Sequence, residues 1–332
     1  MASSSPPSLT PAAPASALRE QLHKDGFVII RQILTPTELE PLRAAAARTT
    51  TLARAGNWPH IRTVGKQFPP WPSKPDPAQG GIWGVQHLLH PDLPDSGVFA
   101  QSYFGDAVLD IVKALLSSSS PSPPEGGREE DRGKGRGECK DDDLVMELYN
   151  MLVRPDAPFE LRWHRDDVPW SAPAAEELAR LGAAEHAHAQ WNLALCDGDA
   201  SLVVVRGSHR RARTDAERFS EPYQAVVHGE DQLTVRLDAG DAVFYDNNIV
   251  HRGVYDCRQE RLSLHGTVGH RAGSAARARN VLQHGVGDWV DKCDFAGSLG
   301  GDERIRKRAE GMRERLVKLG RESGDVGFSL EG

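Results

Sequence analysis

The stretch Phe159-Glu160-Leu161-Arg162-Trp163-His164-Arg165-Asp166 joins an alternating β-strand pattern to a His-x-Asp pair. Residues two apart on a strand project to the same side, so His164 and Asp166 at the end of this strand are expected to point together. With one more histidine they would supply three ligands on one face of an octahedral ferrous ion and leave three positions open. The pattern therefore predicts a non-haem iron site in a β protein.

His-x-Asp alone is a weak signal, because the string also occurs at His23-Lys24-Asp25 and at His90-Pro91-Asp92. The first of these pairs ends a predicted helix, where residues two apart diverge. The second lies in a proline-containing loop with no strand to orient it. Only the pair at 164–166 follows an alternating strand, and we therefore expect it to be the metal motif.

The third ligand must come from a distant part of the chain. His251 follows the turn and strand Gly240–Tyr245 and is the candidate that we favour. His186 and His188 form a rival His-x-His pair, but the segment around them is rich in Ala and Glu and is typical of a helix or loop. We expect His164, Asp166 and His251 to form the metal site.

Arg261, Ser263 and His265 share one face of the last strong strand. A buried arginine costs several kcal/mol unless an anion meets it. A cosubstrate with a free carboxylate is such an anion, and it would take a two-pronged contact from Arg261 and the hydroxyl of Ser263. The alternative is an ion pair between Arg261 and a protein carboxylate. His265 is either a pocket residue or a hydrogen-bonded core histidine.

Several short strands separated by turn signals indicate a mainly β fold, a jelly roll rather than a βαβ fold. Thr35-Pro36-Thr37-Glu38 has the N-cap, first-turn proline and third-position glutamate that start a helix. The expected strands cover residues 144–153, 159–164, 189–195, 202–205, 233–237, 242–245 and 261–269, and the expected helices cover 17–24, 35–48, 106–116 and 302–319.

The chain reads as one domain with irregular additions. Residues 1–16 carry too few apolar groups to offset the entropy of ordering and are expected to be disordered. Residues 17–332 are expected to form a single domain, which would be the oxygenase domain if the iron site is present, with its core at about 18–270. The low-complexity segment 117–143 reads as a flexible insertion, residues 56–98 as irregular loops, and residues 302–320 as a C-terminal helical extension.

The composition narrows the class of partner. Forty Lys and Arg against 47 Asp and Glu give a formal charge of −7, which argues against binding to nucleic acid or an anionic membrane. No apolar run approaches the roughly 18–20 residues of a membrane span. Four scattered cysteines and no signal peptide indicate a cytoplasmic protein with reduced thiols. We expect a small-molecule substrate and a monomer or homodimer.

Six sequence features occur together in order: Leu22–Ile30, Leu34–Leu39, His164 with Asp166, Gly207-Ser208-His209-Arg210, Gly240–Phe244 leading to His251, and Arg261 with Ser263. Through these features, residues 18–270 resemble the phytanoyl-CoA dioxygenase-like family of Fe(II)/2-oxoglutarate-dependent oxygenases. The sequence departs from the family at Arg206, where the family usually has proline, and at Ala200, where it often has glycine.

The resemblance implies a double-stranded β-helix (cupin-like jelly roll) with supporting N-terminal helices and a C-terminal helix. It also implies Fe(II) on His164, Asp166 and His251, with 2-oxoglutarate held by Arg261 and Ser263 and converted by O2 to succinate and CO2. Gln190, Asn192 and Tyr149 are weaker candidates for contacts to this cosubstrate. Halogenating relatives have a small residue where this chain has Asp166, so hydroxylation or desaturation is expected.

An aromatic-rich pocket mouth would suit an apolar or planar small molecule. The candidate substrate-binding residues are Trp83, His87, Trp163, Trp170 and His265, whereas Trp58 and Trp71 are more simply read as loop packing. Two other functions stay open. One is a non-catalytic jelly-roll binding protein, and the other is a redox-neutral, metal-dependent hydrolase or isomerase.

Overall fold

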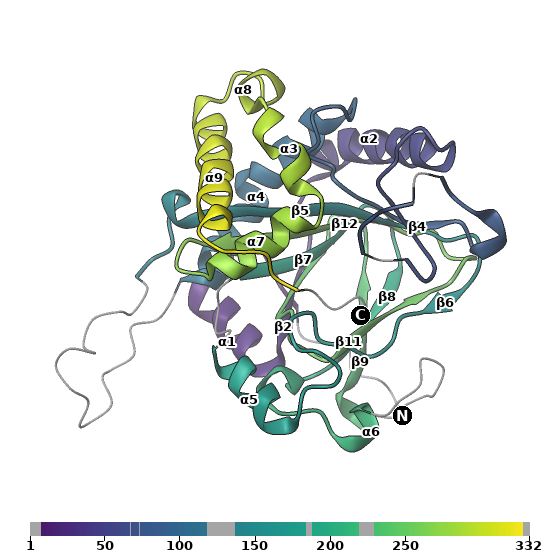
Figure 1. Ribbon diagram of the computed structural model, residues 1–332, viewed down its shortest axis with the longest axis vertical. Coiled ribbons are helices and arrows are strands. Elements are labelled where there is room, and N and C mark those ends of the chain that lie inside the picture. Colours follow the sequence, from purple (N-terminus) through teal and green to yellow (C-terminus); the bar gives the residue numbers. More distant parts are fainter. Residues whose placement is uncertain are drawn as a thin grey trace.

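The chain folds as a double-stranded β-helix in which two sheets face each other (Figure 1). The computed structural model describes residues 8–66, 68–72, 74–117, 137–183, 188–218 and 229–327. The larger sheet runs, in spatial order, β1 (Ser8–Leu9), β2 (Phe27–Ile30), β10 (Ala242–Tyr245), β7 (His188–Ala194), β12 (Leu262–His270), β5 (Leu144–Val153), β4 (Ile82–Val85) and β3 (Ile61–Thr63). The smaller sheet runs β6 (Phe159–Glu160), β11 (His251–Tyr255), β8 (Asp199–Val205) and β9 (Gln232–Leu237).

Helices cover the outer face of the larger sheet, and the smaller sheet lies on its other side (Figure 1). Alternation along β5 shows how one strand serves both faces. Tyr149 and Met151 pack into the core under the helices, whereas Leu148 and Leu152 line an interior cavity. The helices are α1 (Ala15–Asp25), α2 (Pro36–Arg54), α3 (Ser96–Phe104), α4 (Asp106–Leu116), α5 (Ala174–Ala183), α6 (Asp215–Arg218), α7 (Ala275–Gln283), α8 (Phe295–Ser298) and α9 (Glu303–Arg321).

Helix α2 begins where its sequence signal predicts. The Thr35 hydroxyl accepts the N–H of Glu38, and the Glu38 carboxylate accepts the N–H of Thr35, which completes a capping box. The helix continues to Arg54, beyond the expected end near residue 48, because Leu42, Ala46 and Thr49 keep one buried face along it.

Two expectations about disorder were wrong where the structure describes the residues. Ser8–Leu9 pairs in parallel with β2, and α1 begins at Ala15, so the ordered domain starts well before residue 17. Backbone pairing supplies these contacts, which a composition-based prediction ignores. Residues 1–7 and 118–136 lie outside the described part. Residues 137–143 are not a flexible insertion, because Cys139 is buried and the turn Asp141–Asp143 docks through Asp141 on Arg308 of α9.

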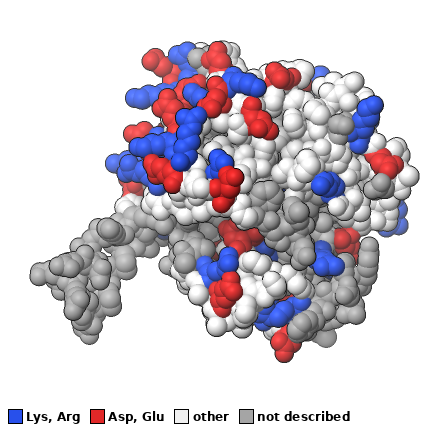
Figure 2. All heavy atoms as spheres, viewed as in Figure 1, with Lys and Arg blue, Asp and Glu red and all other residues white. Residues whose placement is uncertain are grey.

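Residues 56–98 contain more regular structure than expected, because β3 and β4 extend the larger sheet beside β5. Along the chain, the structure also has two helices that the sequence analysis did not predict, α7 and α8, between the expected core and α9. Helix α9 packs its stripe of Ile305, Met312 and Leu316 against the domain and is capped by Asp302. Basic and acidic side chains mix over α9 on the face seen in Figure 2, which gives no single-sign patch there.

No helix within the described residues is long and apolar enough to cross a membrane.

Candidate active site

The three predicted ligands come together inside the double-stranded β-helix. His164 and His251 form an isolated antiparallel bridge in which each backbone N–H donates to the other residue's carbonyl at 3.0 Å. The two rings are therefore neighbours, with centroids 4.3 Å apart. Asp166 Oδ1 lies 3.6 Å from His164 Nε2 and 3.7 Å from His251 Nε2. Candidate ligand atoms from all three side chains lie within 4.8 Å of one another.

Hydrogen bonds behind the rings orient their lone pairs. His164 Nδ1 lies 2.7 Å from the Arg162 carbonyl, and His251 Nδ1 lies 2.8 Å from the Ile249 carbonyl. Because a carbonyl can only accept, each Nδ1 carries the proton and each Nε2 presents a lone pair toward Asp166. The Gln190 amide donates to Asp166 Oδ2 at 2.9 Å. Two nitrogens and one carboxylate oxygen thus fit the facial ligand set of a divalent iron.

The protonation states suit metal binding. Burial, reinforced by the neighbouring His251, lowers the pKa of His164 to about 4, so its ring is neutral at pH 7. Burial by itself would raise the pKa of Asp166, but His251, His164 and the Gln190 hydrogen bond outweigh it and leave that pKa below its usual value. The triad therefore combines a neutral His164 imidazole and an ionised Asp166 carboxylate with the His251 ring.

The strand that leads to His164 is shorter than predicted. Strand β6 ends at Glu160, and both Leu161 and His164 line the cavity, although strict alternation would place them on opposite faces. Trp163 was proposed as a substrate-binding residue, but it packs with Val203, Val205 and Val250, away from the cavity lining. His188 begins β7, and His186 lies outside the described residues.

Arg165, between two ligands, is a structural anchor that the sequence analysis missed. Its buried guanidinium pairs with Glu177 of α5 at 2.7 Å and donates to the carbonyls of Asn248, Ser208 and Arg211. In the Gly-Ser-His-Arg motif, the Ser208 hydroxyl accepts the N–H of Val250, next to His251, at 2.7 Å. The two ligand-bearing segments are therefore tied together behind the metal site.

The triad opens onto a cavity of about 330 Å³ that Arg261 also lines. The Arg261 guanidinium is buried and lies 4.6 Å from the centre of the Tyr255 ring. Its Nε is 3.5 Å from Asp199 Oδ2, and neither Nε nor Nη1 has a hydrogen-bond partner among the described residues. Arg261 therefore lines the same cavity as the three candidate ligands, and two of its nitrogen atoms lack a hydrogen-bond partner.

Asp199 is the other residue that the sequence analysis did not anticipate. The Ser263 hydroxyl donates to Asp199 Oδ2 and is not part of the cavity lining. Burial would raise the pKa of Asp199, but Arg261 and the hydrogen bond from Ser263 keep it below its usual value. Arg261 thus has the protein carboxylate of the second alternative at one edge, and donors without a hydrogen-bond partner among the described residues remain for another anion.

Polar side chains from β7 and β12 line the cavity next to the triad. Gln190, Asn192 and His265 all belong to this lining, and His265 Nδ1 lies 2.8 Å from Asn192 Oδ1. Tyr149, a candidate for cosubstrate contacts, lies on the opposite face of β5. Its hydroxyl meets Ser102 at 2.9 Å and its ring packs on Tyr103, because strand alternation turns it toward the helices.

The remaining aromatic candidates divide into two groups. Trp83 and Trp170 line the cavity. His87 is buried outside the lining, where the Trp289 indole N–H donates to its Nδ1 at 3.2 Å. Trp58 packs in the core and donates to the Gln86 carbonyl, as expected of a loop-packing residue.

A double-stranded β-helix with two histidines and an aspartate at its centre defines the class of jelly-roll metalloproteins. The profile of the phytanoyl-CoA dioxygenase (PhyH) family matches residues 22–254, and the chain belongs to this family. The match includes His164, Asp166 and His251 and ends before Arg261. No protein of curated function matches the sequence.

Solved structures support the fold at low sequence identity. The chain superposes on EctD from S. alaskensis with bound Fe at a TM-score of 0.52 and 15% identity, covering 80% of this chain and 79% of that one. EctD with 2-oxoglutarate and 5-hydroxyectoine gives a TM-score of 0.51 and 14% identity, covering 80% and 78%. AviO1 from Streptomyces viridochromogenes Tue57 gives 0.50 and 19%, covering 78% and 96%.

Proposed function

We propose that this protein is an Fe(II)- and 2-oxoglutarate-dependent dioxygenase that hydroxylates or desaturates a small organic substrate, releasing succinate and CO2. The observation that carries the proposal is the pair of His164 and His251 lone pairs aimed at Asp166 in a cavity that Arg261 also lines. Solved EctD structures contain Fe in one case and 2-oxoglutarate in another. Both groups suit the donors present here.

In this proposal each end of 2-oxoglutarate has its own site. Arg261 binds the far carboxylate with the donors that Asp199 leaves unused, and the keto-acid end meets the iron held by the triad. Ser263 acts through Asp199 by fixing the carboxylate that positions Arg261. When bound, the iron supplies the redox chemistry that uses O2.

The chain's own residues orient the reactants and exclude water. Gln190 holds the second oxygen of Asp166 and so keeps the first one directed toward both histidines. Leu152, Leu161 and Trp83 give one wall of the cavity an apolar surface. Since Asp166 occupies a ligand position, no place is left there for a halide, which favours hydroxylation or desaturation over halogenation.

The test uses the intact protein without oxygen. Adding Fe(II) and then 2-oxoglutarate should produce a visible charge-transfer band, and His164→Ala should abolish it. His23→Gln is the matched control, because it changes an exposed histidine in a second His-x-Asp string at the end of α1. In air, with ascorbate and candidate substrates, substrate-stimulated succinate is expected.

Other results would favour the alternatives. A well-folded wild-type protein that binds Fe(II) but gives no band with 2-oxoglutarate would support a non-catalytic binding protein. Turnover with Zn(II) and no succinate in air would support a redox-neutral hydrolase or isomerase.

A further inference from the structure

The side chain of Arg62 lines the cavity, and it comes from a strand, β3, that the sequence analysis did not predict. It lies on β3, and its side chain crosses β4 at Gly84, where an added Cβ would come within 3.2 Å of both Cβ and Cδ of Arg62. Its guanidinium carbon lies 5.3 Å from the centre of the Trp83 ring and 5.6 Å from that of Trp71. The glycine thus leaves space for Arg62 to lie over both indole rings and line the same cavity as the metal triad.

Arg62 differs from the other arginines around this cavity in its charge partners. Each of the others has a protein carboxylate nearby: Arg165–Glu177 at 2.7 Å, Arg180–Glu176 at 2.8 Å, Arg213–Glu177 at 2.8 Å, Arg261–Asp199 at 3.5 Å and Arg277–Glu147 at 2.8 Å. Arg62 has no ion pair and no hydrogen bond within the described ranges, and its Nε is fully shielded from solvent.

An unpaired cation in this setting needs an external anion. The indole faces attract a guanidinium, but they cannot accept hydrogen bonds from its several in-plane N–H groups. The guanidinium lies over two indole rings with its Nε buried, and this burial lowers the pKa of Arg62. A carboxylate in the cavity would accept the in-plane donors while the rings cover the guanidinium faces.

The cosubstrate is not the expected source of that carboxylate. In the proposed function, the far carboxylate of 2-oxoglutarate meets Arg261, and its other end lies against the cationic metal. Arg62 is on β3 at the end of the larger sheet, whereas Arg261 directly precedes β12, and β5 and β4 lie between these strands. The cation of Arg62 therefore stays available for a second ligand.

We propose that Arg62 binds a carboxylate of the primary substrate, so that the substrate is a small organic acid. This inference rests on the proposed function, since it assigns Arg261 to 2-oxoglutarate. The apolar side chains of Phe68, Trp83 and Leu161 also line this cavity, and they match a hydrocarbon or planar body. In a cavity of about 330 Å³, the charged end anchors the molecule and leaves a neutral position near the triad.

The experiment measures binding to protein loaded without oxygen with Fe(II) and saturating 2-oxoglutarate. Acids are compared with their neutral amides in three pairs: 3-phenylpropionate and 3-phenylpropionamide, hexanoate and hexanamide, and benzoate and benzamide. Tryptophan fluorescence reports binding, because Trp71 and Trp83 adjoin Arg62. For at least one pair, the acid should bind about tenfold or more tightly than its amide, as expected for a charge-assisted contact.

Arg62→Met should remove this preference while leaving the charge-transfer band and the affinity for 2-oxoglutarate unchanged. Arg62→Lys keeps the charge and should retain part of the preference. Arg180→Met is the matched control, because it removes a cavity arginine whose side chain is half-exposed and paired with Glu176. It should leave the preference intact.

Three results would overturn the proposal. The first is no preference for acid over amide in any pair with the wild-type protein. The second is a preference that survives Arg62→Met. The third is a large loss of 2-oxoglutarate affinity in Arg62→Met, which would assign Arg62 to the cosubstrate. Failure of the proposed function is separate, because the wild-type protein would then give no charge-transfer band at all.

Discussion

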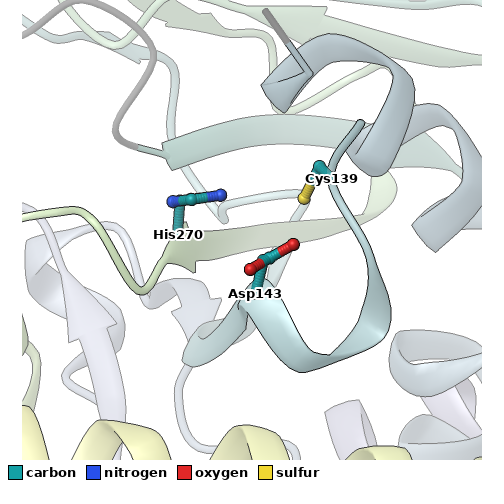
Figure 3. A group of neighbouring side chains, drawn as sticks. All are labelled: Cys139, Asp143 and His270. Carbon is teal, nitrogen blue, oxygen red and sulfur yellow. The ribbon is translucent and has the colours of Figure 1, made fainter. Parts of the chain in front are cut away.

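Among the residues that the structure describes, two groups of three side chains have metal-ligating atoms within 4.8 Å of one another. One is the triad of His164, Asp166 and His251. The other, Cys139, Asp143 and His270, lies where the turn Asp141–Asp143 meets the end of β12, and its three side chains point toward one another (Figure 3). Distance alone does not separate the two groups.

The hydrogen bonds around each group make the difference. In the triad, both Nδ1 atoms donate to carbonyls, so both Nε2 lone pairs face Asp166. In the second group, His270 Nδ1 accepts the N–H of Ala272 at 3.0 Å, which leaves the proton of the neutral ring on Nε2. Asp143 is paired with Arg271 at 2.6 Å and accepts the N–H of Lys140 at 2.9 Å. Ligand capacity therefore depends on what holds each side chain from behind.

The largest expected effect comes from removing a ligand in each group. His251→Ala should weaken Fe(II) binding by more than about 100-fold, since losing an outer hydrogen bond to a ligand already costs about 10–100-fold. Cys139→Ser should leave Fe(II) affinity unchanged. Anaerobic Fe(II) titration followed by calorimetry measures both, with circular dichroism as the folding control. Equal losses in the two variants would contradict the distinction between the groups.

A smaller effect is expected from the arginine beside each group. Arg261→Met should raise the dissociation constant of 2-oxoglutarate by roughly 10–100-fold through loss of a charge-assisted contact, with Fe(II) affinity retained. Arg271→Met is the matched control, because Arg271 is paired with Asp143 and lies outside the cavity lining. Titrating the charge-transfer band with 2-oxoglutarate gives the dissociation constant of 2-oxoglutarate for each of the two variants. An unchanged constant in Arg261→Met would refute the assignment of Arg261.

The smallest effect tests the hydrogen bond behind the triad directly. Gln190→Leu removes the donor to Asp166 Oδ2 without changing charge, and we expect Fe(II) affinity to fall by about tenfold. Asn192→Leu, two residues away on the same face of β7, is the control, because Asn192 bonds to His265 instead of to a ligand. The same calorimetric titration compares them, and a larger loss in Asn192→Leu would be the contrary outcome.

The sequence predicted the elements whose signals are local. The capping box at Thr35, the strand Leu144–Val153 and the helix Asp106–Leu116 were anticipated, the last two with their bounds as observed. The triad was predicted from a strand followed by His-x-Asp, although β6 ends earlier than alternation required. Local periodicity therefore predicted which side chains lie together, but not the exact path of the chain between them.

The missed residues depend on partners that are distant in the sequence. Asp199 matters because it pairs with Arg261 and accepts a hydrogen bond from Ser263. Arg165 matters because it pairs with Glu177. Arg62 lies in a segment rich in Pro, Gly and Trp that reads as irregular loop, because β3 is only three residues long. No pattern within such short segments encodes which strand will lie beside them.

The two backbone hydrogen bonds between His164 and His251 have a consequence for how the site binds its metal. Two peptide groups hold these side chains together whether or not a metal is present, in contrast to small zinc domains that are unfolded without their ion. We therefore expect the metal to bind by simple association with a preformed site, without an accompanying folding step. Because both backbone hydrogen bonds are independent of the metal, we expect the site to keep its arrangement when an ion leaves and to bind another ion without refolding.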